Sequence, residues 1–112
     1  MTNETVLIAG GYGVVGSQIA RLLRKRYPEI EILLGGRSPG QGKELAEELG
    51  RAAAVRLDLS RPNPLAGLER QPTIVLGAVN DIDDNLMLDA ISAHIPYIDI
   101  TAGPNVFGDR FC

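Results

Sequence analysis

Three glycines near the start of the chain are the residues whose types and spacing suggest a chemical task. Gly11, Gly13 and Gly16 form a G-x-G-x-x-G pattern within the segment GGYGVVG. A short apolar run precedes this segment, and a helical pattern begins at Val14. A strand, a glycine turn and a helix in that order favour dinucleotide binding, because the turn lets a pyrophosphate approach the backbone.

Each glycine has a different expected role. We expect Gly11 to turn the chain out of the strand, Gly13 to leave space for the pyrophosphate, and Gly16 to let the helix pack close to the strand. The free backbone amides at Val14 and Val15 and the positive end of the helix dipole would then face the phosphates. The plain alternative is an ordinary turn between a strand and a helix.

The residues after the second predicted strand distinguish NAD from NADP. An acidic side chain about 20 positions beyond the glycines would bind the ribose 2′-hydroxyl of NAD. That place holds Gly36 and Arg37, and an arginine suits the 2′-phosphate of NADP because its guanidinium pairs with phosphate oxygens. Ser38 adds a hydroxyl, although capping of the next helix competes for it. The sequence therefore favours NADP, with NAD or a plain surface arginine as the alternatives.

Three further residues are candidates because ligands bind beyond the carboxyl ends of parallel strands. Asp58 follows the third predicted strand, and it either accepts a hydrogen bond from the adenine amine or is an ordinary turn residue. Asn80 follows the fourth, and it either touches the ribose or nicotinamide side or caps the next helix. We expect Tyr12, inside the glycine turn, to lie over the cofactor-binding loop and to take no part in chemistry.

Other polar residues are weaker candidates. We expect His94 to cap a helix end or lie at the surface rather than act as a base. Asp99, within the fifth predicted strand, is either a buried polar residue or a ligand to the loops, and Lys43 is expected to be solvated. One histidine and one cysteine, Cys112, provide no metal-ligand spacing.

The elements that must position these residues alternate between strand and helix. We expect helices at residues 14–27, at residues 39–49 and from about residue 81, and strands at residues 5–9, 30–34, 53–57, 73–78 and 96–100. Right-handed crossovers and a phosphate turn after the first strand favour the strand order 3-2-1-4-5. The predicted fold is α/β, a three-layer Rossmann fold whose parallel sheet has helices on both faces.

Two helices have specific local predictions. Ser38 and Gln41 form a capping box in front of the second helix, with Pro39 in its first position. In the first helix, an apolar stripe at helical spacing comprises Val15, Ile19, Leu22 and Leu23. In the last helix, the predicted core face comprises Leu86, Ala90, Ile91 and Ala93.

Composition limits the protein class. A chain of 112 residues with 45% hydrophobic content is typical of one globular domain. The net charge of -3 and the 4% aromatic content argue against a nucleic-acid-binding surface. No apolar stretch reaches membrane-spanning length, no leader sequence is recognisable, and one cysteine forms no internal disulfide. We therefore expect a soluble, cytoplasmic protein with no membrane partner.

Three segments resemble the saccharopine dehydrogenase and reductase superfamily. Residues 7–16, LIAGGYGVVG, look like the opening of that family, and residues 33–38, LLGGRS, are similar to its second strand and the turn after it. Residues 94–100, HIPYIDI, resemble its fifth strand. The segments occur in the family's order and cover nearly the whole chain. The acids that follow Asn80 depart from the family's small residues and prolines.

The resemblance implies that residues 1–112 are the N-terminal NAD(P)-binding domain of a longer oxidoreductase. Enzymes of this family pass hydride between nicotinamide and a carbon–nitrogen centre of an amino-acid-derived substrate. By resemblance, the three glycines bind the pyrophosphate, and Arg37 and Ser38 bind the adenosine phosphate. The family's substrate and dimerisation domain is missing from this sequence, so we expect cofactor binding without turnover. Homodimer formation is left open.

Other function classes differ in specific residues. A non-catalytic module that senses the NADP redox state is the main alternative, because the sequence holds no recognisable catalytic set. A short-chain dehydrogenase fragment would need a Tyr-x-x-x-Lys pair, and none of the three tyrosines has a lysine four residues later. An S-adenosylmethionine methyltransferase would usually have an acid where Arg37 stands.

Overall fold

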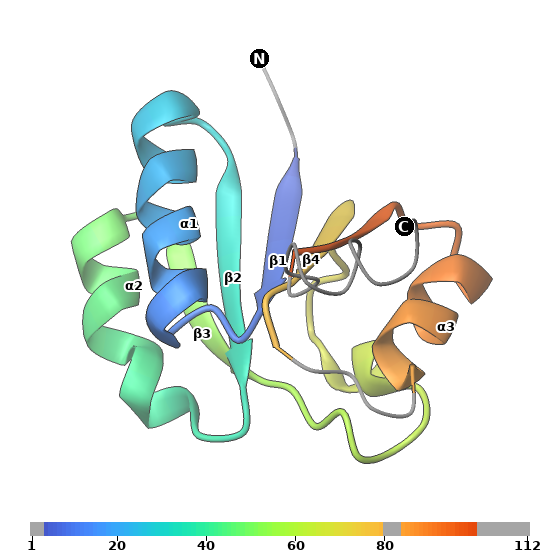
Figure 1. Ribbon diagram of the computed structural model, residues 1–112. Helices are drawn as coiled ribbons and strands as arrows, with labels where there is room; N and C mark the ends of the chain where they lie inside the picture. The colour runs from blue at the N-terminus through green and yellow to red at the C-terminus, as the bar shows by residue number, and fades with distance from the viewer. Residues whose placement is uncertain (1–3, 80–83, 101–112) are drawn as a thin grey trace, which may run out of the picture.

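The computed structural model describes residues 4–79 and 84–100, and the predictions for Asn80 and for residues 101–112 lie outside the described residues. Figure 1 shows the arrangement of the elements along the chain. In chain order they are β1 (Thr5–Ala9), α1 (Val14–Arg26), β2 (Glu31–Gly36), the 3-10 helix η1 (Pro39–Gly42), α2 (Lys43–Leu49), β3 (Ala52–Arg56), the 3-10 helix η2 (Pro64–Gly67), β4 (Ile74–Gly77), α3 (Asn85–Ser92) and β5 (Tyr97–Asp99).

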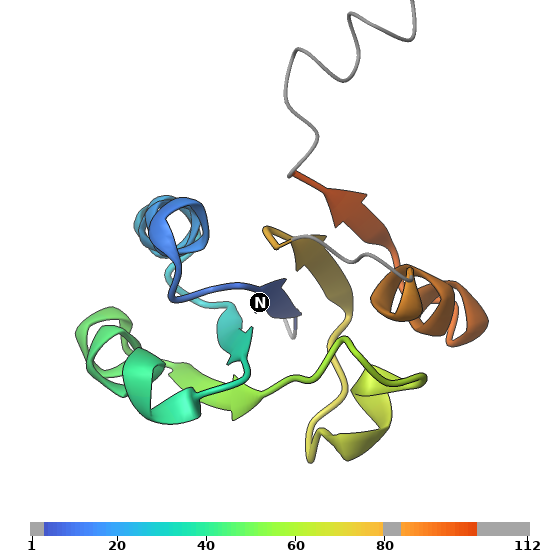
Figure 2. The ribbon, with the colours of Figure 1, turned by 60° about the horizontal axis from the view of Figure 1, so that its bottom comes forward.

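The five strands form one parallel sheet in the order β3-β2-β1-β4-β5, as the sequence predicts. In the register of the sheet, Leu7 of β1 lies between Leu33 of β2 and Val75 of β4. Helices α1 and α2 cover one face, whereas η2 and α3 lie on the other (Figure 2). The three-layer α/β Rossmann architecture is therefore confirmed.

Strand β1 is the centre of the molecule, and all five of its residues are buried. Its side chains alternate between the two faces, as the strand geometry requires. Val6 and Ile8 belong to the core under α1 and α2, whereas Leu7 and Ala9 belong to the core under η2 and α3. Continuous burial explains why this strand is apolar without alternation.

Helix α1 approaches the sheet through its smallest residues. Gly16 and Ala20, one turn apart, are the buried positions of the helix. The predicted apolar stripe is only partly buried, because Val15 and Leu22 are 51% and 66% exposed. These two residues lie about 100–120° around the axis of α1 from Arg21, whose guanidinium donates a hydrogen bond to Glu48 of α2. Contact with the sheet and contact with α2 therefore leave part of the apolar stripe uncovered.

The predicted capping box before α2 is wrong. The 3-10 helix η1 precedes α2, and the Ser38 side chain caps neither helix. Instead, the Ser38 carbonyl accepts a hydrogen bond from the backbone N–H of Gln41 at 2.9 Å. Pro39 does occupy the first position of η1. Helix capping therefore does not use the Ser38 hydroxyl.

Helix α3 is shorter than the sequence suggests. Leu86 and Ala90 are buried as predicted, but Ile91 is 60% exposed. Ile91 follows Ala90 by about 100° around the helix axis, which turns it away from the core. Ala93 lies beyond the last helical residue and is exposed. The predicted core face is therefore right for two of its four residues.

Candidate functional site

The candidate site begins where β1 ends and the chain turns toward α1. The backbone N–H groups of Gly10 and Gly11 both donate to the Gly35 carbonyl of β2, at 2.7 and 3.3 Å. Gly10 has a φ of +81°, in the left-handed region that residues with a side chain rarely adopt. The tight turn therefore depends on Gly10, which the spacing pattern did not single out, rather than on Gly11.

Gly11 and Gly16 are required by packing. A Cβ atom on Gly11 would lie 2.9 Å from the Ile8 carbonyl oxygen and from the Leu34 Cα. A Cβ atom on Gly16 would lie 2.9 Å from the Gly11 Cα and would overlap the Gly10 carbonyl. The close approach of α1 to the strand at Gly16 is thus confirmed, and it involves backbone atoms that no side-chain movement can relieve.

Gly13 differs from the other two glycines of the pattern. It is exposed, and a Cβ atom there would meet only the Gly10 carbonyl oxygen, at 3.3 Å. Its backbone is extended, with a φ of -79°, so that its conformation does not require glycine. The packing reason for a glycine is therefore weaker at this position than at Gly11 and Gly16, where a Cβ atom would come within 2.9 Å or less of backbone atoms.

The N-terminus of α1 carries backbone N–H groups that have no hydrogen-bond partner among the described residues. Gly13 is the N-cap residue, no side chain caps this helix end, and its first turn contains no acid. Ser17 N donates to the Gly13 carbonyl at 2.9 Å, so the amides of Val14, Val15 and Gly16 precede the hydrogen-bonded turns. Together with the helix dipole, these amides favour an anion in front of the helix.

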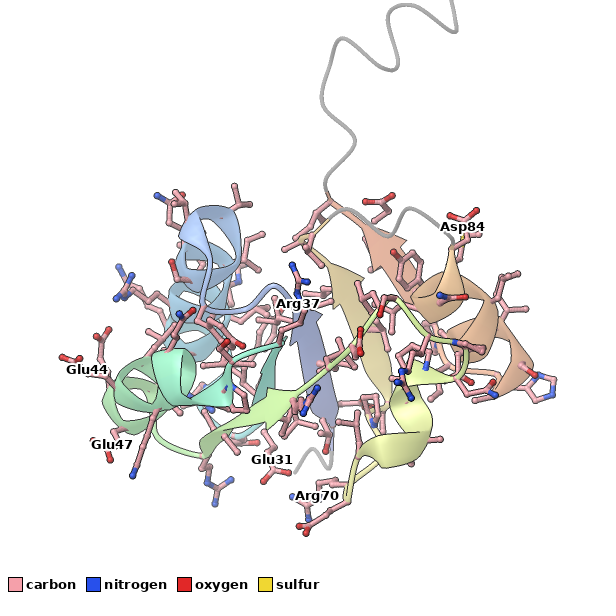
Figure 3. All side chains as sticks on the ribbon, turned by 90° about the horizontal axis from the view of Figure 1, so that it is seen from below. Glu31, Arg37, Glu44, Glu47, Arg70 and Asp84 are labelled. Atoms are coloured by element: carbon pink, nitrogen blue, oxygen red, sulfur yellow. The ribbon has the colours of Figure 1, made fainter. Side chains whose placement is uncertain are left out.

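Arg37 and Ser38 lie at the same edge of the sheet as the glycine turn. Figure 3 looks onto this edge, and Arg37 stands near its centre. Arg37 is exposed and, within residues 4–79 and 84–100, no hydrogen bond or ion pair occupies its guanidinium. The Ser38 N–H donates to the Tyr12 hydroxyl at 2.9 Å. The structure thus joins the glycine turn to the segment after β2 through Tyr12.

Asp58 is held in a turn beside the end of β2. Leu57 N donates to the Gly36 carbonyl at 2.8 Å, which places Asp58 next to the segment that carries Arg37. Asp58 Oδ1 accepts hydrogen bonds from Ser60 Oγ at 2.6 Å and Ser60 N at 3.0 Å. The Ser60 hydroxyl, followed by the Ser60 amide, lowers the pKa of the Asp58 carboxyl. Asp58 therefore has the role of a turn residue and remains a candidate ligand for adenine.

The weaker candidates lie at different edges of the sheet, with Asp99 at the carboxyl end of β5, opposite Gly77 of β4. His94 is exposed, has a φ of +60°, and comes between α3 and β5, at the amino edge of the sheet. Asp99 is exposed rather than buried. In the described part of the chain, no group of three or more His, Cys, Asp or Glu residues could hold a metal ion. Within the same ranges, no helix has the length and hydropathy to cross a membrane.

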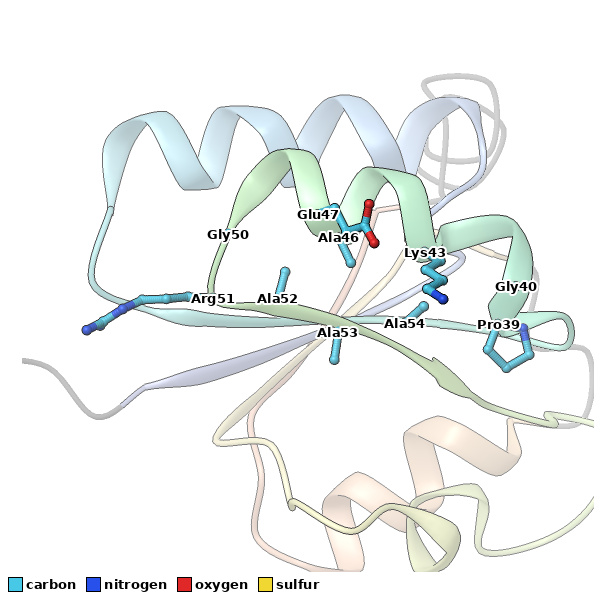
Figure 4. Close-up of a pocket in the computed structure, with 10 residues that line it drawn as sticks. All are labelled: Pro39, Gly40, Lys43, Ala46, Glu47, Gly50, Arg51, Ala52, Ala53 and Ala54. Atoms are coloured by element: carbon cyan, nitrogen blue, oxygen red, sulfur yellow. The ribbon is translucent and has the colours of Figure 1, made fainter.

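A hollow of about 590 Å³ lies elsewhere, between α2 and the outer side of β3 (Figure 4). Its lining includes Ala46, Gly50, Ala52 and Ala54, with Lys43 near one end. Small apolar side chains dominate it, and none of the predicted binding residues contributes to it. The candidate site therefore remains the glycine turn and the segment after β2.

Several solved structures share the fold of this chain. Saccharopine dehydrogenase (L-Glu forming) from Saccharomyces cerevisiae is similar with a TM-score of 0.71 and 16% identity, over 96% of this chain and 24% of that chain. A putative NAD-dependent epimerase/dehydratase from Bacillus halodurans has a TM-score of 0.70 and 19% identity, over 87% of this chain and 50% of that chain. The chain has the fold of the matched parts of these two proteins.

A third similar structure contains a bound cofactor. The dTDP-glucose 4,6-dehydratase from Bacillus anthracis str. Ames, in complex with NAD, has a TM-score of 0.65 and 17% identity, over 86% of this chain and 36% of that chain. No family model matches the sequence. No curated protein matches it either. The chain thus spans about a quarter to a half of the length of these three structures.

Proposed function

We propose that this chain is the dinucleotide-binding domain of an NAD(P)-dependent oxidoreductase and that it binds NADP(H) in preference to NAD(H). The observation that carries the proposal is the N-terminus of α1 together with Arg37, both of which lack a side-chain partner within residues 4–79 and 84–100. Both lie at the carboxyl edge of the sheet, where parallel α/β folds bind ligands. Of the similar proteins, one is described as NAD-dependent and another contains NAD.

The pyrophosphate would lie against Gly13. Because packing restricts a side chain less at Gly13 than at Gly11 and Gly16, space for a ligand adds a reason for this glycine. The amides of Val14, Val15 and Gly16 would donate to the phosphate oxygens, and the dipole of α1 would stabilise their charge. Gly11 contributes indirectly, because it lets the turn pack against β2.

The adenosine end of the cofactor would lie toward β2 and β3. Arg37 would pair with the 2′-phosphate through its guanidinium, and the Ser38 hydroxyl would donate to the same group. Asp58 would accept a hydrogen bond from the adenine amine with the carboxylate oxygen that Ser60 leaves free. Asn80 would touch the ribose or the nicotinamide side.

We further propose that a second domain supplies the substrate site and the catalytic residues. The match covers 24% of the similar saccharopine dehydrogenase chain, so most of that protein lies outside this fold. The substrate would be amino-acid-derived, with hydride transfer at a carbon–nitrogen centre. In this account, residues 1–112 bind the cofactor and do not turn over substrate.

Replacement of Gly13 tests where the pyrophosphate binds. Gly13→Val should abolish NADPH binding in calorimetric titration, because the new side chain fills the space proposed for the phosphates. The melting curve should remain cooperative, since few protein atoms lie near this position. Gly67→Val is the matched control, because Gly67 lies in η2 with no heavy atom within 4 Å of an added Cβ. Binding of NADPH by Gly13→Val at the wild-type affinity would contradict the proposal.

A further inference from the structure

Tyr12 bridges two segments that are far apart in sequence. It belongs to the glycine turn, yet its ring lies against Gly36 at the end of β2 and against Gly42 at the end of η1. A Cβ atom on Gly42 would lie 2.5 Å from Tyr12 Cδ1, and a Cβ atom on Gly36 would overlap the hydroxyl end of the ring. The two glycines therefore make the space that the aromatic ring fills.

The Tyr12 hydroxyl holds the backbone next to Arg37. Its oxygen accepts the hydrogen bond from Ser38 N at 2.9 Å. A tyrosine hydroxyl that accepts one hydrogen bond can still donate its own hydrogen. Within residues 4–79 and 84–100, no acceptor takes that hydrogen. The chain therefore presents a fixed donor beside the segment that carries the guanidinium of Arg37.

We propose that Tyr12 is a specificity-determining residue, whose hydroxyl fixes the Ser38 amide and donates its hydrogen to the phosphate that distinguishes NADP from NAD. The inference rests on the proposed function, because it needs a dinucleotide at this edge of the sheet. Arg37 supplies charge on a long and exposed side chain, whereas Tyr12 supplies a donor held by backbone contacts. A donor fixed in advance loses less entropy when it binds an anion than a free one does.

The test compares two ligand pairs that differ in the 2′-phosphate, NADPH with NADH and 2′,5′-ADP with 5′-AMP. Tyr12→Phe keeps the ring and removes only the hydroxyl. It should weaken NADPH and 2′,5′-ADP by about tenfold, the loss expected for one hydrogen bond to a charged group. NADH and 5′-AMP should change by less than about twofold. Tyr27→Phe, which removes an exposed hydroxyl after α1, should change none of the four affinities.

A second variant keeps the Tyr12 hydroxyl but changes the position of the ring that carries it. Gly42→Ala should push the Tyr12 ring aside and reduce the preference for NADPH over NADH. Gly40→Ala is the matched control in the same 3-10 helix, because an added Cβ there has no neighbour within 4 Å. It should keep the wild-type preference.

The outcomes separate the two proposals. If the wild-type protein prefers NADPH and Tyr12→Phe keeps that preference, the role of Tyr12 is wrong and the proposed function stands. Equal weakening of NADPH and NADH binding by Tyr12→Phe would also overturn the proposed role of Tyr12, since a purely structural residue would affect both cofactors alike. If the wild-type protein binds NADPH and NADH equally, both the NADP preference and the role of Tyr12 are overturned.

Discussion

The two sides of β1 differ in how tightly their parts are joined. On the side of β2 and β3, the Arg24 guanidinium of α1 donates to the carbonyls of Leu49, Gly50 and Arg51, at 3.0, 2.7 and 3.1 Å. These bonds tie α1 to the end of α2 and the start of β3. On the side of β4 and β5, Ile98 is 51% exposed.

On the sheet face that α1 and α2 cover, the side chains of β4 and β5 are less completely buried than those of β1 and β2. Leu76 of β4 and Ile98 of β5 are register neighbours, so they point to the same face. Leu76 packs only partly against the core under α1 and α2, and Ile98 lies outside it. Val15 and Leu22 of α1 are also exposed.

The difference between the two sides of β1 corresponds to a difference in their proposed roles. The half around β2 carries the proposed cofactor contacts, and there the backbone is held by glycine packing, by Arg24 and by Tyr12. Such contacts position donors before a ligand arrives, which lowers the cost of binding. In the half around β5, Asp89 and Asn85 of α3 bond the Leu65 amide and the Leu59 carbonyl, but among the described residues the apolar side chain of Ile98 remains at the surface. We therefore expect mutations in the two halves to change the free energy of unfolding by unequal amounts.

The largest effect is expected where α1 touches the glycine turn. Gly16→Val should destabilise the fold by at least about 3 kcal/mol, because its side chain would overlap the Gly10 carbonyl and force backbone atoms apart. Urea unfolding followed by circular dichroism measures the change. Gly13→Val is the contrast within the same turn and should cost clearly less, about 1 kcal/mol, because it replaces a favourable N-cap glycine and meets only the Gly10 carbonyl oxygen, at 3.3 Å. Similar destabilisation by both variants would show that the two glycines do not differ as described.

Truncation of one apolar residue in each half compares their packing directly. Leu34→Ala in β2 should cost about 2–5 kcal/mol, because Leu34 is fully buried and its loss leaves a cavity. Ile98→Ala in β5 should cost less than about 1 kcal/mol, since half of the side chain is already in water. The free energies of unfolding from urea titrations give both values. An equal cost would refute the difference between the halves.

The two arginines of α1 that face α2 show which kind of contact stabilises the half around β2. Arg24→Gln should cost about 1–3 kcal/mol, because it breaks hydrogen bonds to backbone carbonyls that join three elements. Arg21→Gln removes an exposed ion pair with Glu48 and should leave the unfolding midpoint unchanged. Comparable losses would mean that surface charge, not carbonyl binding, joins α1 to this half.

The smallest effect concerns the turn after β3 and depends on pH. The Ser60 hydrogen bonds lower the pKa of the folded Asp58 carboxyl below its usual value of 3.8. The resulting stabilisation is present above the unfolded pKa and is lost as the pH falls through the folded pKa. Ser60→Ala should therefore be slightly less stable than the wild type at pH 7, and this difference should diminish toward pH 3. A difference that grows in acid would contradict the assigned cause.

The sequence was sufficient to predict the architecture because the architecture depends on local signals. Apolar strands alternate with helices, and crossover handedness then restricts the strand order to the one observed. The packing role of Gly16 followed from its spacing alone. Strand β1 has the predicted ends, and the ends of the other four strands differ from the predicted ones by one or two residues.

Other features of the site depend on three-dimensional contacts. The left-handed conformation of Gly10 follows from its hydrogen bond to Gly35, and no spacing rule indicates it. Gly42 accommodates the ring of Tyr12. The turn before α2 is a 3-10 helix, which the Ser38 side chain does not cap. In the sequence, the glycines at positions 36 and 42, before and after Arg37, were the indication that the ring of another residue packs there.

The most direct test of the central claim is parallel calorimetric titration of the wild type and Arg37→Ala with NADPH and NADH. We predict that the wild type binds NADPH more tightly than NADH. Arg37→Ala should lose about 1.5–3 kcal/mol of NADPH binding free energy and almost none for NADH, because one charge-assisted phosphate contact is removed. A wild type that prefers NADH, or equal losses for both cofactors, would contradict the assignment of Arg37 to the 2′-phosphate.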